Sequence, residues 1–70
     1  MVKVGDRIYL LKTTDPYIDL TLNEYIGRVF DINYVNLDEP FTQIWVKFDN
    51  GSQFALIPEF GDKFKVISKL

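Results

Sequence analysis

Two groups of acidic residues carry the side chains best suited to catalysis or metal binding. Asp15, Asp19 and Glu24 fall in one polar segment, and Asp38 and Glu39 fall in another. Pairs of carboxylates serve general acid–base catalysis or bind Ca²⁺ and Mg²⁺. The spacing matches no known cation-binding loop, and surface loops carry such residues because they are solvated. We therefore expect structural roles for all five residues, and we expect no metal and no cofactor.

The chain contains neither Cys nor His. This composition leaves out disulfides, Cys/His zinc sites, Cys and Ser-His nucleophile systems, and the usual general base near pH 7. Asp49-Asn50-Gly51-Ser52 holds several oxygen donors and matches the glycosylation pattern, but these residue types together are typical of a tight turn. We predict that the protein is not an enzyme.

Trp45 is the only Trp of the chain and the first candidate for a partner-binding residue. Trp is enriched among the few residues that carry most of the binding energy of protein interfaces. In a regular strand Trp45 points away from the core on the same face as Lys47 and Gln53, which resembles the polar rim of a contact site. These three residues form the predicted surface for a protein partner or a second copy. In the alternative, the long loop after the first strand covers Trp45 through Tyr17 or Leu20.

A second candidate surface is basic and comes from the two ends of the chain. If the first and last strands are neighbours, it brings together five cations and one aromatic ring: Lys3, Arg7, Tyr9, Lys63, Lys65 and Lys69. Cations beside an aromatic ring are typical of a nucleic-acid interface. However, the net charge of −2 argues against a sequence-independent DNA binder, although it does not exclude a local basic face. Lys residues also protect strand edges and favour solubility, so nucleic-acid binding is the alternative hypothesis.

A tight hairpin positions these candidate residues. Asn50-Gly51 between two apolar runs is the strongest short-range hairpin signal. A two-residue loop would place Phe48 opposite Gln53 and would mix apolar and polar residues on both faces. A three-residue loop that also includes Asp49 separates the apolar face from the polar face. We predict the three-residue loop, with Gly51 at positive φ.

The three-residue loop fixes the pairing of the two hairpin strands. The predicted cross-strand pairs are Lys47 with Gln53, Val46 with Phe54, Trp45 with Ala55, and Ile44 with Leu56. Further strands are predicted at 7–11, 25–32 and 63–67, with long connections at 13–24 and 33–42 and a short turn at 58–62. Gly27 predicts a bend or bulge within its strand. Residues 21–24 fit the capping-box pattern, which allows one helical turn.

The 70 residues are enough for one domain, residues 1–70, and their 16% aromatic content supplies a core of sufficient area. Five short strands with a long loop after the first predict an all-β fold, a small five-stranded SH3-like barrel that is partly open. The OB fold is the alternative, but it commonly carries a helix between its third and fourth strands. The residues predicted to be largely buried are Ile8, Leu10, Val29, Ile44, Val46, Phe48, Phe54, Leu56, Phe64 and Val66.

Several motifs resemble, in the same order, those of a family of short prokaryotic and mobile-element proteins classed as a domain of unknown function. The motifs are Val4-Gly5-Asp6-Arg7-Ile8, Asp15-Pro16-Tyr17, Gly27-Arg28-Val29, Val46-Lys47-Phe48-Asp49-Asn50-Gly51-Ser52, Leu56-Ile57-Pro58 and Asp62-Lys63-Phe64-Lys65-Val66-Ile67. The chain departs from the family in having Phe48 where Trp is commoner, and in a longer connection at 33–43. The resemblance implies an SH3-like barrel and no particular activity.

A non-enzymatic binding or assembly module is the leading functional hypothesis. The alternative is a nucleic-acid-associated protein, and a small enzyme comes third. The N-terminus has no apolar segment typical of a signal peptide, and polar residues interrupt every apolar run, so we expect a cytoplasmic protein without a membrane span. Self-association or a protein partner is expected.

Overall fold

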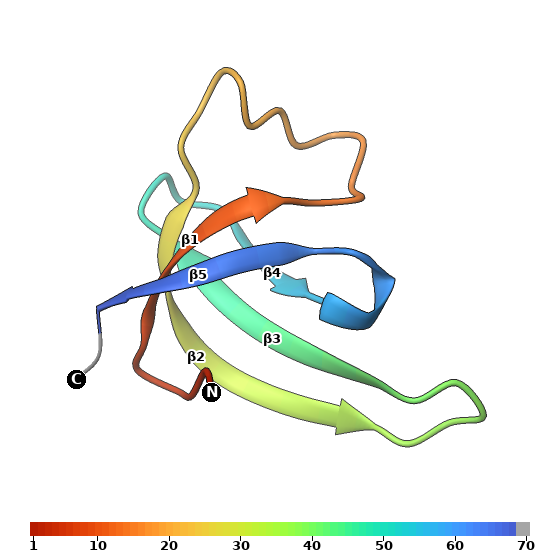
Figure 1. Cartoon of the computed structure of the whole chain (residues 1–70). Helices are drawn as coiled ribbons and strands as arrows, with labels where there is room; N and C mark the ends of the chain where they lie inside the picture. Colours follow the sequence, from red (N-terminus) through yellow and green to blue (C-terminus); the bar gives the residue numbers. More distant parts are fainter. Residues whose placement is uncertain (69–70) are drawn as a thin grey trace.

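The computed structural model describes residues 1–68 as an all-β domain with one five-stranded antiparallel sheet (Figure 1). The elements are β1 (Arg7–Lys12), β2 (Ile26–Val35), β3 (Phe41–Phe48), β4 (Gln53–Leu56), the 3₁₀ helix η1 (Pro58–Phe60) and β5 (Lys63–Ser68). The strand order is β4-β3-β2-β1-β5, so β4 and β5 are the two edges of a curved sheet that is not closed. The prediction of a partly open, five-stranded barrel with a long loop after the first strand is confirmed.

The hairpin between β3 and β4 has the predicted three-residue loop. The observed pairs are Ile44–Leu56, Trp45–Ala55, Val46–Phe54 and Lys47–Gln53. The Phe48 N–H donates to the Ser52 carbonyl at 2.8 Å, and the Gly51 N–H donates back to the Phe48 carbonyl at 3.1 Å. Gly51 has a φ of 93°, a region that residues with a Cβ rarely occupy.

We expect Gly51→Ala to lower the free energy of unfolding by about 1 kcal/mol, because a left-handed conformation costs an L-residue about that much. A Cβ at Gly51 would meet no atom within 4 Å, so backbone conformation alone sets this cost. A thermal melt should show the midpoint falling by roughly 4–8 °C. An unchanged midpoint would contradict the left-handed assignment.

The core lies on the concave side of the sheet. Seven of the ten residues predicted to be largely buried are buried: Ile8, Leu10, Val29, Ile44, Val46, Phe48 and Leu56. The other three, Phe54, Phe64 and Val66, are half-buried and pack against this cluster. The hairpin loop sorts the inner face as predicted, because Phe54 and Leu56 lie on the same side as Val46.

Strand β2 is longer than the sequence predicted. It pairs with β3 as far as Val35 opposite Phe41, so only residues 36–40 remain as a loop where a connection over 33–42 was expected. The register shift in this pair lies between Val29 and Asp31, so the bulged residue is Phe30. Gly27 instead marks a close approach of two strands, because a Cβ there would lie 2.5 Å from the carbonyl oxygen of Lys47.

The helical turn that the capping-box pattern allows at 21–24 is absent, and those residues lie in turn and irregular backbone. Asp19 organises this part of the loop, because its carboxylate accepts hydrogen bonds at 2.9 Å from the Thr21 N–H and at 2.5 Å from the Thr21 hydroxyl. These hydrogen bonds lower the pKa of Asp19. A short side-chain-capped turn therefore replaces the helix, as is common for Asp in loops.

Two carboxylates are buried at the ends of the sheet. Asp6, just before β1, accepts a hydrogen bond from the Lys3 N–H at 3.0 Å and is only 1% exposed. Asp62, just before β5, accepts from the Thr14 N–H at 3.1 Å and from the Ile57 N–H at 2.8 Å. Asp62 therefore ties the long loop after β1 to the residue that precedes η1.

Candidate functional site

The outer, convex face of the sheet carries the three residues predicted to bind a partner. Lys47 and Gln53 are a cross-strand pair, and Trp45 pairs with Ala55 one step further along the hairpin. Their neighbours in β3, Ile44 and Val46, are buried in the core. Alternation along the strand therefore places Trp45, Lys47 and Gln53 together on the opposite side, as the sequence predicted.

Trp45 is half-buried, and its aromatic neighbour is Phe30 of β2. The two ring centroids are 6.4 Å apart with an interplanar angle of 47°. Phe30 is the bulged residue of β2 and is itself 44% exposed. A bulge re-aims a side chain and sharpens the local twist, which accounts for an aromatic pair on the outer face. Sequence reasoning missed Phe30. Its position directly after the inward-facing Val29 does indicate an outward side chain, because successive residues of a strand point to opposite faces.

The long loop after β1 does not supply the aromatic neighbour of Trp45. Tyr17, one of the two residues considered for this role, is 95% exposed. Leu20, the other, packs against the inner core cluster. The loop also brings Tyr25 inward, where its ring meets Phe48 edge-on at a centroid distance of 5.3 Å. The loop thus contributes to the concave side of the sheet, whereas Trp45 lies on the convex side.

A row of three cations crosses the outer face beside Trp45. Arg7 of β1 pairs with Arg28 of β2, and Arg28 pairs with Lys47 of β3. Side chains directly opposite each other on neighbouring strands have Cβ atoms about 5 Å apart, so like charges in these positions repel. We call these three residues the cation row. Sequence reasoning left out Arg28 because the pairing of β1 with β2 depends on a loop of unpredictable path.

The three members of the cation row have different partners. The Arg7 guanidinium donates two hydrogen bonds to the Asp49 carboxylate, at 2.8 and 2.6 Å. These bonds and the positive charges of Arg7 and Arg28 lower the pKa of Asp49. Arg28 donates to the carbonyl oxygen of Gly5 at 2.6 Å. Over residues 1–68, Arg7–Asp49 is the one salt bridge, which leaves Lys47 without a carboxylate partner.

The predicted basic patch lies on the same face, with two exceptions. Tyr9 and Lys65 are a cross-strand pair between β1 and β5, and Lys63 pairs with Lys12 at the far end of these strands. Lys3 lies in the turn before β1 and is not part of the sheet. Lys69 lies outside the described residues. The two surfaces that the sequence predicted separately are therefore neighbours, joined by the cation row.

Charge is divided between the strands and the rest of the chain. The five strands carry six cations and one acidic residue, Asp31, which gives a net charge of +5. The remaining residues carry two cations and nine acidic residues, a net charge of −7, so the total is −2. Five of the strand cations are exposed and Arg7 is half-buried, which places this positive charge on the surface. A weakly acidic chain thus presents a basic sheet face.

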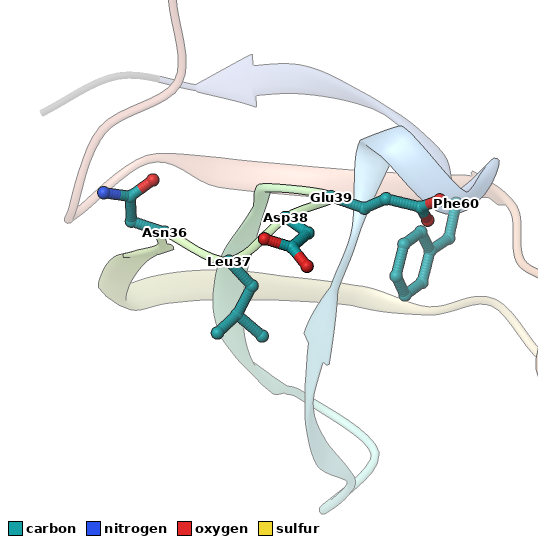
Figure 2. A pocket seen from close by; sticks show the side chains of 5 residues that line it. All are labelled: Asn36, Leu37, Asp38, Glu39 and Phe60. Carbon is teal, nitrogen blue, oxygen red and sulfur yellow. The ribbon is translucent and has the colours of Figure 1, made fainter.

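A pocket lies away from this face, between the β2–β3 loop and η1. Figure 2 shows the loop on one side and Phe60 on the other, and the lining residues are Asn36, Leu37, Asp38, Glu39 and Phe60. Leu37 and Phe60 are 64% and 55% exposed, so the pocket is shallow and open to solvent. The ring of Phe60 contacts that of Phe41, with centroids 5.2 Å apart. The pocket carries acidic side chains, whereas the charge of the outer face is mainly positive.

The carboxylate of Glu59 holds η1 in place, in addition to that of Asp62. Glu59 accepts hydrogen bonds from the N–H and the hydroxyl of Thr42, at 3.1 and 3.0 Å. The hydrogen bond from the Thr42 N–H is the leading cause of a lowered pKa of Glu59. Glu59 therefore serves to anchor η1 to the start of β3, which leaves it committed to a structural role.

Other kinds of site can be reported briefly. Within residues 1–68, no three Asp, Glu, His or Cys side chains come together in a group able to hold a metal ion. No helix in that part of the chain is long and apolar enough to cross a membrane. The arrangement on the outer face offers cations and aromatic rings, which suit binding by charge and stacking.

Comparison of the chain with protein-family models, curated proteins and solved structures finds no match. The resemblance to a family of unknown function therefore stays a prediction from the motifs.

Proposed function

We propose that this protein is a non-enzymatic binding module and that the outer face of its sheet is the contact surface. The observation that carries the proposal is the half-exposed Trp45–Phe30 pair directly beside the cation row. The core is built from the residues of the inner face, so neither aromatic ring is needed to fill it. The largest side chain of the chain is thus placed outside the core.

The surroundings of Trp45 have the composition of a contact site. Aromatic rings and Arg are enriched in interface hot spots, and polar residues at the rim exclude water from them. By register, Asp31 lies opposite Trp45, and Lys47, Gln53 and Arg28 lie one step further along the strands. Arg7, Arg28 and Lys47 place like charges opposite each other, which does not stabilise the sheet. A partner with negative charge would relieve this repulsion, and the relief would add to its affinity.

We expect Trp45→Ala to weaken association much more than it weakens folding. Loss of a hot-spot Trp costs about 2 kcal/mol or more of binding free energy, roughly thirtyfold in affinity. The free energy of unfolding should fall by only about 1 kcal/mol, since the ring is half-exposed and loses one aromatic contact. The measurement is the amount of partner from the native host that the immobilised chain retains, with sedimentation of the pure protein to detect self-association.

Tyr17→Ala is the matched control, because Tyr17 is a highly exposed aromatic residue in the loop after β1. It should retain the same partner as the wild type. The proposal is wrong if the wild type is a monomer that retains nothing and Trp45→Ala mainly lowers the melting temperature.

A further inference from the structure

We infer that the outer face binds single-stranded nucleic acid. This inference rests on the proposed binding function and names the partner. It commits to an extended polyanion with exposed bases, whether RNA or single-stranded DNA, because both offer phosphates and flat aromatic faces.

The charge of the strands is the first step. Six cations against one acidic residue give the sheet a net charge of +5, although the whole chain has a net charge of −2. Sequence-independent nucleic-acid binding depends on the cations that face the phosphates and on the counterions they displace, so the local excess is the relevant quantity. Two acidic residues reduce this excess on the outer face, because Asp49 pairs with Arg7 and Asp31 lies opposite Trp45. Five others lie in the loops 13–25 and 36–40.

The cation row supplies a line of positive charge. Within residues 1–68 the Lys47 side chain is free, while Arg7 pairs with Asp49 and Arg28 donates to Gly5. Neighbouring strands are about 4.8 Å apart, so the row from Arg7 through Arg28 to Lys47 extends for roughly 10 Å. Lys65, paired with Tyr9, adds a further cation on the β5 side. Lys47 and Lys65 are exposed, and neither side chain forms a hydrogen bond or ion pair within the described part of the chain.

Aromatic rings lie on both sides of the cation row. β1 and β3 are both antiparallel to β2 and therefore run in the same direction. Trp45 comes two residues before Lys47 in β3, whereas Tyr9 comes two residues after Arg7 in β1, so the two rings lie on opposite sides of the row. Each is displaced from it by about 7 Å along its strand. A single strand crossing the face diagonally can place phosphates on the cations and stack a base at each end.

Single-stranded nucleic acid fits these features better than a duplex or an acidic protein. A duplex keeps its bases stacked inside, so it would use the cations and leave Tyr9 and Trp45 without stacking partners. Residues 1–68 also contain no α-helix, and the convex face is a five-stranded sheet, broader than the two-stranded ribbon that a major groove admits. An acidic protein would satisfy the charges but offers no repeated flat rings to match aromatic residues on both sides of the row.

Fluorescence of Trp45 gives a direct test, because it is the only Trp. We expect a 12-nucleotide oligo(dT) or oligo(U) to quench this fluorescence and to raise the anisotropy of a labelled oligonucleotide, with Kd of about 10⁻⁶ to 10⁻⁴ M. The logarithm of the association constant should fall linearly with the logarithm of salt concentration, by about 0.7 for each phosphate contacted. A duplex of the same length should bind more weakly and should not quench Trp45.

The double variant Lys47→Gln/Lys65→Gln should lower affinity at least about tenfold and reduce the salt slope by about 1.4, the value for two lost contacts. Asn23→Asp/Asn36→Asp is its matched control, because it changes net charge by the same amount at exposed loop positions. The control should bind within about twofold of the wild type. Circular dichroism and thermal melts establish that each variant is folded.

Two results would overturn the inference while leaving the proposed function intact. One is absence of binding to every oligonucleotide at low salt while Trp45→Ala still loses a partner that survives nuclease treatment. This result would identify a protein as the occupant. The other is equal binding of duplex without any effect on Trp45. If no oligonucleotide binds and Trp45→Ala loses no partner, both the inference and the proposed function are wrong.

Discussion

Gly27→Ala should lower the free energy of unfolding by about 3 kcal/mol or more, the largest effect expected of any single methyl group in this chain. Gly27 is buried at the centre of the sheet, opposite Ile8 on one side and Phe48 on the other. An added Cβ would lie 2.5 Å from the Lys47 carbonyl oxygen and 2.8 Å from the Phe48 Cα. Both are backbone atoms, so β3 must shift away from β2 to make room.

Thermal and urea melts of Gly27→Ala measure this effect. A loss of 3 kcal/mol corresponds to a fall in melting temperature of roughly 12–24 °C for a domain of this size. Such a domain has only about 3.5–10 kcal/mol of stability, so the variant should be partly unfolded under mild conditions. Gly51→Ala is the control, since it also adds one methyl group but meets no neighbouring atom and should cost about 1 kcal/mol. Equal melting temperatures for the two variants would contradict the close approach at Gly27.

The close approach at Gly27 also affects the outer face. Gly27 directly precedes Arg28, so the separation of β2 and β3 there sets the spacing of Arg28 from Lys47. A variant that pushes these strands apart should weaken binding at the outer face even where it remains folded. Under the proposed function, stability and binding are therefore linked at this position through the geometry of the sheet.

The hairpin was predictable from the sequence because local rules and burial agree there. Only one loop length puts Val46 and Phe54 on the same face, and burial of that face fixes the register. The bulge at Phe30 was not predictable in the same way, since it depends on how β2 pairs with a strand eleven or more residues away. Gly27 signalled an irregularity, but its type, a close approach and not a bulge, depends on atoms of β3.

The candidate site was predictable in its parts and not as a whole. Alternation along single strands placed Trp45, Lys47, Tyr9 and Lys65 outward, and the structure agrees. Arg28 was missed because it completes the row only once β1, β2 and β3 are in register. Net charge did not reveal this face for a related reason, because it sums acidic loops with basic strands.

The buried carboxylates were missed because Asp before a strand is typical of a solvated turn. Asp6 and Asp62 both precede β-strands, and both are buried. Both directly follow a Gly at positive φ, whereas the exposed Asp15 follows Thr14 and accepts a hydrogen bond from the Tyr17 N–H. Only the tertiary path of the chain brings backbone N–H groups to Asp62 from positions as far apart as Thr14 and Ile57.

Asp62→Ala should lower the free energy of unfolding by about 2–3 kcal/mol, the second largest effect we expect. The substitution leaves the N–H groups of Thr14 and Ile57 without their acceptor in a partly buried place. It also releases the connection between the loop after β1 and η1. Thermal melts should show a fall of roughly 8–24 °C, and amide hydrogen exchange at Ile57 should become faster.

Asp62→Asn distinguishes this account from a simple loss of charge. The two oxygens of Asp62 accept from different donors, Oδ1 from Thr14 and Oδ2 from Ile57, so an amide can satisfy one and must turn its own NH₂ toward the other. We expect Asp62→Asn to lower the free energy of unfolding by at least half as much as Asp62→Ala.

Asp6→Asn is the matched control. Only Oδ2 of Asp6 accepts a hydrogen bond, from Lys3, while its buried Oδ1 has no partner within the described residues. That substitution keeps the one bond and removes a buried charge, so its cost should stay below about 1 kcal/mol. Equal losses for Asp6→Asn and Asp62→Asn would mean that charge, and not the two-donor geometry, determines the role of Asp62.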